Sequence, residues 1–412
     1  MEKINILVVQ SDTVGGVGFY RSFQPHNKLT ELFPEEFNVV FCTDPQWSNL
    51  PWFDQFDIIH VHRGLYGDMN EYKQALHYFK SHNIITILDI DDHWKLDKEH
   101  PLYFQQKAYN LDEVLKSTFK EYDYITTTTK IFADTIKPFN KNVKIMPNAI
   151  DPEDERFIVK KNQSKRLRIG MVMGSSHEYD MQLIGKISNM LSKEELEKVQ
   201  FVLCGFDTGG AMRNINVTTG EITERPLLPT ESVWYRYEQI MTSDYTIISP
   251  EYKNFLLQFI KNYDYPKYEN EPYRRCWTMD IDHYYQHYAN VDVLLAPLVV
   301  KDFNKVKSQL KVIECAFSHT ALIASNFGPY TIDLKSAIER GGEINKEGNA
   351  LLVDENKNHK NWLKYIKKLI KEPELVKMLQ DNLYNDIKDK YNLANVTKDR
   401  ADFYKKIVEG KK

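Results

Sequence analysis

Leu167-Arg168-Ile169-Gly170-Met171-Val172 is an apolar run that starts a new series of predicted strands in the middle of the chain. Similar runs return four times after it, separated by longer segments of other patterning. Such an alternation is typical of a parallel sheet with crossover helices. We therefore predict a doubly wound sheet here, with strands at residues 167–172, 199–205, 292–298, 321–324 and 350–353.

The N-terminal part of the chain shows the same alternation. Its predicted strands lie at residues 4–9, 38–42, 58–62, 84–90, 124–127 and 143–146. A linker-like tract at residues 151–165 then interrupts the apolar period. We predict an α/β fold of two Rossmann-like domains facing a cleft. Their expected extents are residues 1–155, completed by a helix at 394–412, and residues 156–393.

Length and composition support two domains of ordinary soluble character. The chain has 412 residues, more than one hydrophobic core usually serves. With 27% charged residues and a net charge of -4, it is neither disordered nor strongly basic. No signal-peptide pattern and no apolar run of about 20 residues is evident, so we expect a cytoplasmic protein without stable membrane insertion. The oligomeric state stays open.

The cysteines do not form a recognisable motif. There is no CxxC pair, and no histidine follows at zinc-finger spacing. We therefore expect buried, reduced thiols and no metal site from Cys42, Cys204, Cys276 and Cys315.

Residues 206–274 form a polar stretch that is rich in tyrosine and exceeds ordinary loop lengths. We predict an insertion with its own helices, which would carry an acceptor site or an oligomer contact. Amphipathic helices are predicted after it at residues 361–370, 373–391 and 396–408.

Three glycines lie between the first predicted strand and the helix that follows it. Without a Cβ atom, Gly15, Gly16 and Gly18 let the backbone approach a ligand, and the helix start offers N–H groups to an anion. The spacing does not match G-x-G-x-x-G, which disfavours a nicotinamide site. A glycine-rich turn facing the cleft is the preferred interpretation.

The segment Lys307-Ser308-Gln309-Leu310-Lys311-Val312-Ile313-Glu314 has the apolar spacing of a helix. Ser308 is placed at its N-cap or first turn, and Lys311 and Glu314 fall on neighbouring turns. A phosphate at this helix start would meet free amides, the helix dipole and a lysine, while the carboxylate could accept two ribose hydroxyls. The alternative is a solvated Lys/Glu face.

The order of these and further motifs resembles the large family-four group of GT-B glycosyltransferases, which are retaining and use nucleotide sugars. The resemblance covers most of the chain except the insertion. The matching segments are residues 57–62, 146–151, 170–177, 304–314, 320–325 and 348–353. It implies a GT-B fold with an N-terminal acceptor domain and a C-terminal donor domain. It also implies metal-independent glycosyl transfer from a UDP- or GDP-linked sugar as co-substrate, with no other cofactor.

The resemblance also implies roles for individual donor-binding residues. Glu314 would hold the donor ribose, and Lys311 and Arg275 would neutralise the diphosphate leaving group. Ser308 and Gln309 would offer amides at the helix start. Positive charge is needed there because the leaving diphosphate gains charge in the transition state. A surface arginine is the alternative interpretation of Arg275.

Two departures from the family pattern concern the same site. The family's paired glutamates are spaced eight apart, but Val306 stands where the first is expected. The usual Arg and Lys after the first strand of the second domain are replaced by Ser175, Ser176 and His177. We therefore include His177 among the predicted donor-binding residues, and the identity of the sugar stays open.

Asp91 and Asp92 follow the strand predicted at residues 84–90. Carboxylates at a strand end of an α/β domain face the ligand crevice, so we predict that both contact the transferred sugar or position the acceptor hydroxyl as catalytic residues. One alternative is a D-x-D metal site of Asp89 and Asp91. Another is a capping role for Asp92. Histidines such as His62 are weaker candidates.

Other functions remain open on this sequence. The same fold could serve a nucleotide-sugar epimerase or hydrolase, or a catalytically silent binding protein that uses the tyrosine-rich insertion. The acceptor could be a glycan, a lipid-linked intermediate, a protein or a modified base in DNA. The insertion and the segment at residues 15–21 loosely resemble glycosyltransferases of bacteriophages, which would act in the host cytoplasm on a nucleobase or surface glycan.

Overall fold

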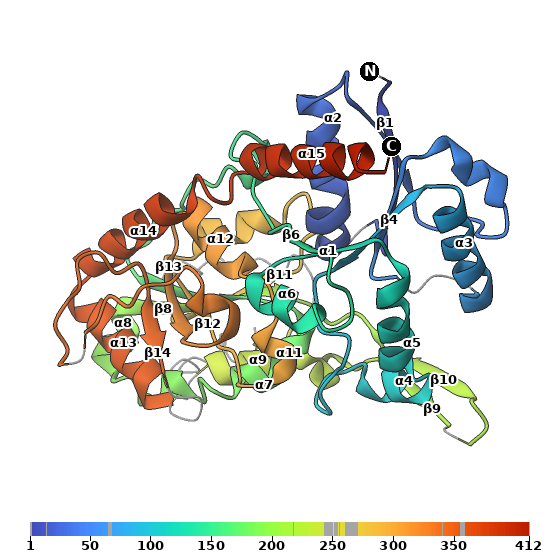
Figure 1. The fold of residues 1–412 in the computed structure, drawn as a ribbon. Coiled ribbons are helices and arrows are strands. Elements are labelled where there is room, and N and C mark those ends of the chain that lie inside the picture. Colours follow the sequence, from blue (N-terminus) through green and yellow to red (C-terminus); the bar gives the residue numbers. More distant parts are fainter. Residues whose placement is uncertain are drawn as a thin grey trace. The chain divides into compact units, whose positions relative to one another are not determined.

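The chain divides into two compact units. The computed structural model describes residues 2–13, 15–64, 68–216, 218–242, 250, 254, 256–259, 271–339, 341–354 and 359–411. Unit 1 comprises Met1–Pro152, Lys301–Ile313 and Lys388–Lys412, and unit 2 comprises Glu153–Val300 and Glu314–Ile387. Each unit contains a six-stranded parallel sheet with helices (Figure 1). The predicted α/β class with two doubly wound sheets is confirmed.

Unit 1 has the strand order β2-β1-β3-β4-β5-β6. Its central strands β1 (Ile4–Val9), β3 (Ile58–His62) and β4 (Ile85–Ile90) are rich in isoleucine and valine and largely buried, as a parallel sheet covered on both faces requires. The other strands are β2 (Phe37–Cys42), β5 (Tyr124–Thr127) and β6 (Val143–Ile145). The helices, with η marking 3-10 or π turns, are α1 (Gly16–Gly18), η1 (Phe19–Phe23), α2 (Gln24–Leu32), η2 (Leu50–Gln55), α3 (Met69–Ser81), α4 (Tyr103–Ala108), α5 (Leu111–Thr118), η3 (Phe119–Glu121), α6 (Lys130–Ile136), α11 (Asp302–Lys305) and α15 (Leu393–Glu409).

The last helix of the chain completes unit 1. α15 lies against α2 (Figure 1). Its residues Ala401, Tyr404 and Ile407 join a buried apolar cluster with Ile6 and Val8 of the first strand. The C-terminal helix therefore supplies part of the core on which the N-terminal strand packs.

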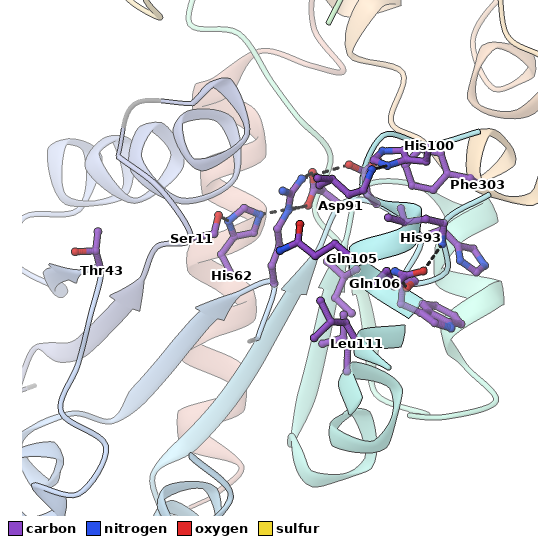
Figure 2. Close-up of a pocket in the computed structure, with 17 residues that line it drawn as sticks. Ser11, Thr43, His62, Asp91, His93, His100, Gln105, Gln106, Leu111 and Phe303 are labelled. Atoms are coloured by element: carbon purple, nitrogen blue, oxygen red, sulfur yellow. Dashed lines mark hydrogen bonds and ion pairs between the residues drawn. The ribbon is translucent and has the colours of Figure 1, made fainter. Parts of the chain in front are cut away.

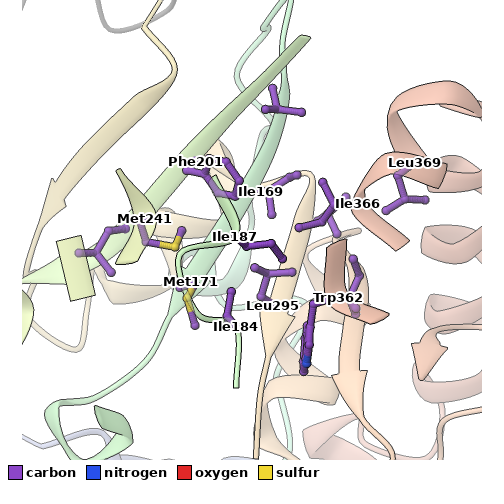
Figure 3. Close-up of a cluster of buried hydrophobic side chains, with 14 of the residues drawn as sticks. Ile169, Met171, Ile184, Ile187, Phe201, Met241, Leu295, Trp362, Ile366 and Leu369 are labelled. Atoms are coloured by element: carbon purple, nitrogen blue, oxygen red, sulfur yellow. The ribbon is translucent and has the colours of Figure 1, made fainter. Parts of the chain in front are cut away.

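Unit 2 has the strand order β11-β8-β7-β12-β13-β14. Its strands are β7 (Leu167–Val172), β8 (Val199–Phe206), β11 (Tyr273–Trp277), β12 (Val293–Ala296), β13 (Ala321–Ser325) and β14 (Leu351–Val353). Its helices are η4 (Glu155–Phe157), η5 (Ser175–His177), α7 (Glu178–Met181), η6 (Ile187–Met190), α8 (Lys193–Lys198), η7 (Pro229–Glu231), α9 (Val233–Met241), η9 (Tyr284–Asn290), η10 (Gly328–Thr331), α13 (His359–Lys371) and α14 (Glu374–Ile387), with α12 (Leu310–Phe317) beginning in unit 1. In the core, Ile169, Phe201 and Leu295 of the sheet pack with Trp362 and Ile366 of α13 (Figure 3).

Local capping interactions explain where several helices begin. The carboxylate of Asp68 accepts the backbone N–H of Asn70 at 2.7 Å and starts α3. Ser192 and Glu195 form a reciprocal capping box at the start of α8. Each such contact satisfies an N–H group that the helix itself leaves without a partner.

The structure differs from the sequence prediction mainly in the insertion. Within residues 206–274 it forms a hairpin of β9 (Ala211–Ile215) and β10 (Ile222–Pro226) and the helix α9, and β11 begins at Tyr273. β11 pairs with β8 as the edge strand of the sheet, which the prediction missed. The rest of the tyrosine-rich stretch, at residues 243–249, 251–253, 255 and 260–270, lies outside the described residues. Across the described part of the chain, no helix is long and apolar enough to cross a membrane.

A buried ion pair fixes the helical segment after β1 to the end of β4. Arg21 of η1 donates from Nε and Nη2 to the two carboxylate oxygens of Asp89, at 2.9 and 2.6 Å. The exposed fraction of either side chain is at most 1%. Arg21 Nη1 also donates to the carbonyl oxygen of Met146 at 2.6 Å, and the Thr126 hydroxyl donates to Asp89 at 2.6 Å. The pair is thus well hydrogen-bonded, which a buried charge requires.

Replacing Arg21 by methionine is expected to lower the free energy of unfolding by about 3–5 kcal/mol, because Asp89 would remain as a buried charge without its partner. Urea denaturation followed by circular dichroism measures this change. Lys130→Met is the matched control, since it removes a cation from the exposed Lys130–Asp134 pair and should leave the denaturation midpoint unchanged. Equal midpoint shifts in the two variants would contradict a structural role for the buried pair.

The same pair has a defined pH dependence. Burial raises the pKa of Asp89, but Arg21 outweighs burial and lowers this pKa to about 2. Since the unfolded carboxyl titrates near pH ~4, the stabilisation is complete above that pH and is lost as the pH falls towards about 2. Between these two values the wild-type chain should therefore lose more stability than Asp89→Asn, as measured by urea denaturation at each pH. Parallel losses in both proteins would show that Asp89 titrates normally.

Candidate functional site

A pocket of about 600 Å³ opens in unit 1 where β1, β3 and β4 end (Figure 2). Carboxyl ends of parallel strands are the usual ligand sites of α/β domains. The polar wall of the pocket is formed by Ser11, His62, Arg63, Asp91 and Asp92. Aromatic, imidazole and amide side chains from the segment after β4, from α4 and from α11 line its other side. Every lining residue belongs to unit 1.

His62 connects the pocket mouth to a buried carboxylate. The Ser11 Oγ atom lies 2.7 Å from His62 Nδ1, and His62 Nε2 lies 3.3 Å from Asp91 Oδ1 (Figure 2). Because an ionised carboxylate can only accept, Nε2 carries the proton towards Asp91, and Nδ1 can accept from the Ser11 hydroxyl. The imidazole is fully buried, whereas Ser11 is exposed. The network therefore orients a hydroxyl at the pocket mouth.

Arg63 holds Asp91 in its ionised form. Its Nε and Nη2 atoms donate to the two oxygens of Asp91 at 2.9 and 3.0 Å, and Nη2 lies 3.3 Å from Asp92 Oδ2. Burial raises the pKa of Asp91, but Arg63 and then His62 lower it well below its usual range. Asp91 is thus a poor proton acceptor, and its role is to hold the side chains of Arg63 and His62 in place. The Asp92 side chain is 39% exposed against 11% for Asp91, so Asp92 is the carboxylate that a ligand can reach.

The backbone of Arg63 adopts the left-handed conformation, with φ of 66°. Its N–H group donates to the carbonyl oxygen of Asp89 at 2.9 Å. A non-glycine residue in this region is strained, and such strain is concentrated at functional sites. The turn directs the guanidinium from the end of β3 across to the carboxylates that follow β4.

The sequence analysis selected Asp91 and Asp92, ranked His62 low and missed Arg63. The available signal was the position of His62-Arg63 at the end of the strand preceding β4, because the ends of neighbouring parallel strands meet at one edge. The D-x-D alternative is not favoured. Both oxygens of Asp89 accept from Arg21, in the core and not in the pocket.

The glycine-rich turn is shaped by Asp12. Its Oδ1 atom accepts the N–H of Gly15, and a Cβ atom added to Gly15 would lie only 2.6 Å from that oxygen. A Cβ atom on Gly18 would collide with the backbone oxygen of Asp12, and Gly16 begins α1. Thus protein groups already require glycine at two of these positions, and the carboxylate of Asp12 lies at the helix start. Donor binding by the three glycines remains a prediction.

The residues before α12 are hydrogen-bonded within unit 1. Ser308 Oγ accepts from the side-chain amide of Asn148 at 3.1 Å. The buried Gln309 donates from Nε2 to the hydroxyl of Tyr391 at 2.6 Å. Gln309 directly precedes Leu310, the first residue of α12, and Ser308 lies one residue further out, outside the N-cap or first-turn position predicted for it. Both side chains are held by neighbouring segments of the chain.

Lys311 lies half-buried in the first turn of α12, and Glu314 follows one turn later in unit 2. Glu314 is fully buried and accepts a hydrogen bond from the Tyr288 hydroxyl at 2.8 Å. Burial and then Glu314 raise the pKa of Tyr288 well above its usual value, so this phenol stays protonated. Their predicted contacts with diphosphate and ribose remain predictions.

His177 and Arg275 have different surroundings in unit 2. His177 Nδ1 lies 2.7 Å from Asp180 Oδ2, and Asp180 also accepts the backbone N–H of Val299 at 2.8 Å, after β12. His177 is thus held near the carboxyl ends of β7 and β12. Arg275 instead forms a fully buried ion pair with Glu238, with both contacts at 2.7 Å. This geometry gives its predicted phosphate contact no support.

No protein-family model matches the sequence, and no curated protein matches it significantly. The structure does resemble solved structures over nearly its whole length. Sucrose-phosphate synthase from Thermosynechococcus elongatus has a TM-score of 0.61 at 11% identity, covering 99% of this chain and 100% of that one. Anabaena HepE in complex with UDP has a TM-score of 0.57 at 10% identity, covering 98% and 100%.

A third neighbour is an alpha-glucosyltransferase in complex with UDP and a 13-mer DNA. Its TM-score is 0.56 at 11% identity, and the match covers 98% of this chain and 99% of that one. At these identities the likeness shows the fold alone. The GT-B fold expected from the sequence motifs is thereby confirmed, since the matches include both units.

The strain at Arg63 can be tested with two substitutions that both remove the guanidinium. Arg63→Gly is expected to be more stable than Arg63→Ala by about 1 kcal/mol, because alanine resists the left-handed conformation. Urea denaturation measures the difference. At Lys137, which has ordinary helical angles, the order should reverse. The same order at both positions would show that Arg63 is not strained.

Proposed function

We propose that the chain is a glycosyltransferase that moves a sugar from a nucleoside diphosphate donor, UDP- or GDP-linked, to a hydroxyl acceptor. The fold supports this class, because HepE has been solved with UDP-glucose and the alpha-glucosyltransferase with UDP-glucose and DNA. The observation that carries the proposal is the ionised Asp91, held by Arg63 and His62 in the strand-end pocket of unit 1.

The pocket has the chemistry that a sugar requires. A sugar ring presents hydroxyl groups at its edge and apolar C–H groups on its faces. The polar wall offers the exposed carboxylate of Asp92 and the hydroxyl of Ser11, and the opposite wall offers the rings of Trp94 and Phe303 and the amide of Gln105. A volume of about 600 Å³ lies within the range of small-ligand sites.

The two carboxylates have separate roles in the proposal. In the transfer, the acceptor oxygen forms a bond to the anomeric carbon, the diphosphate leaves with the electrons of the broken C–O bond, and the proton of the acceptor hydroxyl passes to the departing diphosphate. Asp92 orients the acceptor hydroxyl, because it is the more exposed group. Asp91 stays ionised and fixes Arg63 and His62, so that the pocket keeps its shape during the reaction.

The donor half of the proposal rests on α12 and its neighbours. Ser308 and Gln309 immediately precede this helix, whose first amides and dipole favour an anion. Lys311 supplies positive charge for the leaving diphosphate, and Glu314 accepts from the ribose hydroxyls. His177, held by Asp180, is the further donor contact that we propose.

Transfer is tested by incubating the purified chain with UDP- and GDP-sugars and measuring the release of nucleoside diphosphate. Acceptors in the panel are hydroxymethylated DNA, polysaccharide and cell lysate, and mass spectrometry locates the added sugar. We expect release to depend on an acceptor. Full turnover of donor alone would instead identify a hydrolase or epimerase of the same fold.

Asp92→Asn is expected to lower kcat by about 100-fold or more with little change in donor affinity, because it removes the carboxylate that orients the acceptor. Asp91→Asn should also lower kcat, since Arg63 and His62 lose their common partner. Asp54→Asn, at an exposed position of unit 1, is the matched control. Unchanged kcat in both site variants, in an active enzyme, would show that this pocket does not serve catalysis.

Glu314→Gln keeps an acceptor for Tyr288 but removes the negative charge that would hold the ribose. It is expected to weaken UDP or GDP binding by about 10- to 100-fold, the size of a lost charge-assisted hydrogen bond. Calorimetry measures the affinity, with the exposed Glu343→Gln as matched control. Equal affinities in both variants would place the nucleotide elsewhere, even if transfer itself is observed.

A further inference from the structure

Two cysteines and a histidine from three elements of unit 2 converge on one side of the sheet. Cys204 lies on β8, Cys276 on β11 and His287 on η9. Their Sγ and ring nitrogen atoms all lie within 4.8 Å of one another. The convergence depends on the fold, because Cys204 is far in the sequence from Cys276 and His287 and meets them through strand pairing.

The sheet register places the two thiols together. Cys204 and Cys276 are direct partners in the parallel pairing of β8 with β11, so their side chains project from the same face. On β11, Arg275 turns to the opposite face to pair with Glu238, while Arg274 Nη1 reaches Asn290 of η9 at 2.8 Å. Alternation along the strand therefore directs Cys276 to the η9 side, where His287 lies.

His287 is the buried imidazole of this cluster. Its side chain is only 1% exposed, and neither ring nitrogen makes a hydrogen bond of ordinary geometry within the described part of the structure, although the imidazole lies close enough to the Cys276 thiol to interact with it. Buried polar groups in folded proteins nearly always have a partner. Coordination of a cation by one ring nitrogen would supply it.

We propose that Cys204, Cys276 and His287 bind a zinc ion. Thiolate and imidazole are the ligands that Zn²⁺ prefers, with Zn–S and Zn–N bonds of about 2.3 and 2.0 Å. Those bonds place the ligand atoms of a tetrahedral site about 3.5–3.8 Å apart, so the ligand atoms need to move together by at most about 1 Å. Three protein ligands leave the fourth position for water. The ion would join the edge strand β11 to β8 and η9.

The test uses the full reduced chain after removal of metals by a chelator. Zn²⁺ is titrated against a chromophoric competitor, and Co²⁺ is added separately as a spectroscopic probe. One Zn²⁺ per chain is expected, together with a thiolate-to-cobalt charge-transfer band and visible bands of tetrahedral Co²⁺. The cobalt spectrum tests the site in the unmodified protein. Absence of the thiolate band would overturn the proposal and leave a cluster of protonated thiols and imidazole.

Substitutions then assign the ligands. Cys204→Ala and Cys276→Ala are expected to weaken Zn²⁺ binding by about 100-fold or more and to abolish the charge-transfer band, and His287→Gln should weaken binding while keeping that band. Cys42→Ala is the matched control, because this cysteine lies on β2 in unit 1. Circular dichroism checks that each variant is folded. Wild-type affinity in both folded cysteine variants would overturn the site.

Discussion

The position of the pocket in unit 1 depends on the buried pair of Arg21 and Asp89. A carboxylate at the centre of an apolar sheet is tolerated only with a charged, hydrogen-bonded partner, and the helical segment after β1 supplies it. The pair thereby fixes the last residues of β4. Asp91 follows only two residues later, so the position of the pocket carboxylates is inherited from an interaction inside the core.

The pocket contains a second arginine–aspartate ion pair, which lies nearer the surface. Arg63 neutralises Asp91 as Arg21 neutralises Asp89, but here one carboxylate, Asp92, remains accessible. Two ion pairs, Arg21–Asp89 and Arg63–Asp91, thus lie one after the other at the end of β4. The Arg21–Asp89 pair serves stability. The Arg63–Asp91 pair combines rigidity with the exposed carboxylate of Asp92, which can accept from hydroxyl groups, as the proposed sugar site requires.

Strand positions could be predicted from the sequence because buried parallel strands are apolar throughout, and β1, β3, β5 and β7 were predicted with the bounds observed. β11 was missed because its sequence, Tyr273-Arg274-Arg275-Cys276-Trp277, contains two adjacent arginines and lacks an apolar run. The carboxylates Asp91 and Asp92 were visible as residues at a strand end. Arg63 and the cluster around His287 were not, because their partners are defined by strand order and register, which the sequence pattern alone does not give.

The order in which the segments of the two units follow one another along the chain affects folding during translation. It passes between the units at residues 152, 300, 313 and 387, and unit 1 takes its last helix from the C-terminal end. During translation, unit 2 has all of its residues before unit 1 has received Ala401 and Tyr404, which cover Ile6 and Val8. The N-terminal strands therefore leave the ribosome first, but the helix that completes their core is synthesised last. The early apolar surface must be sheltered, by transient contacts or by chaperones, for most of the time that the polypeptide is being made.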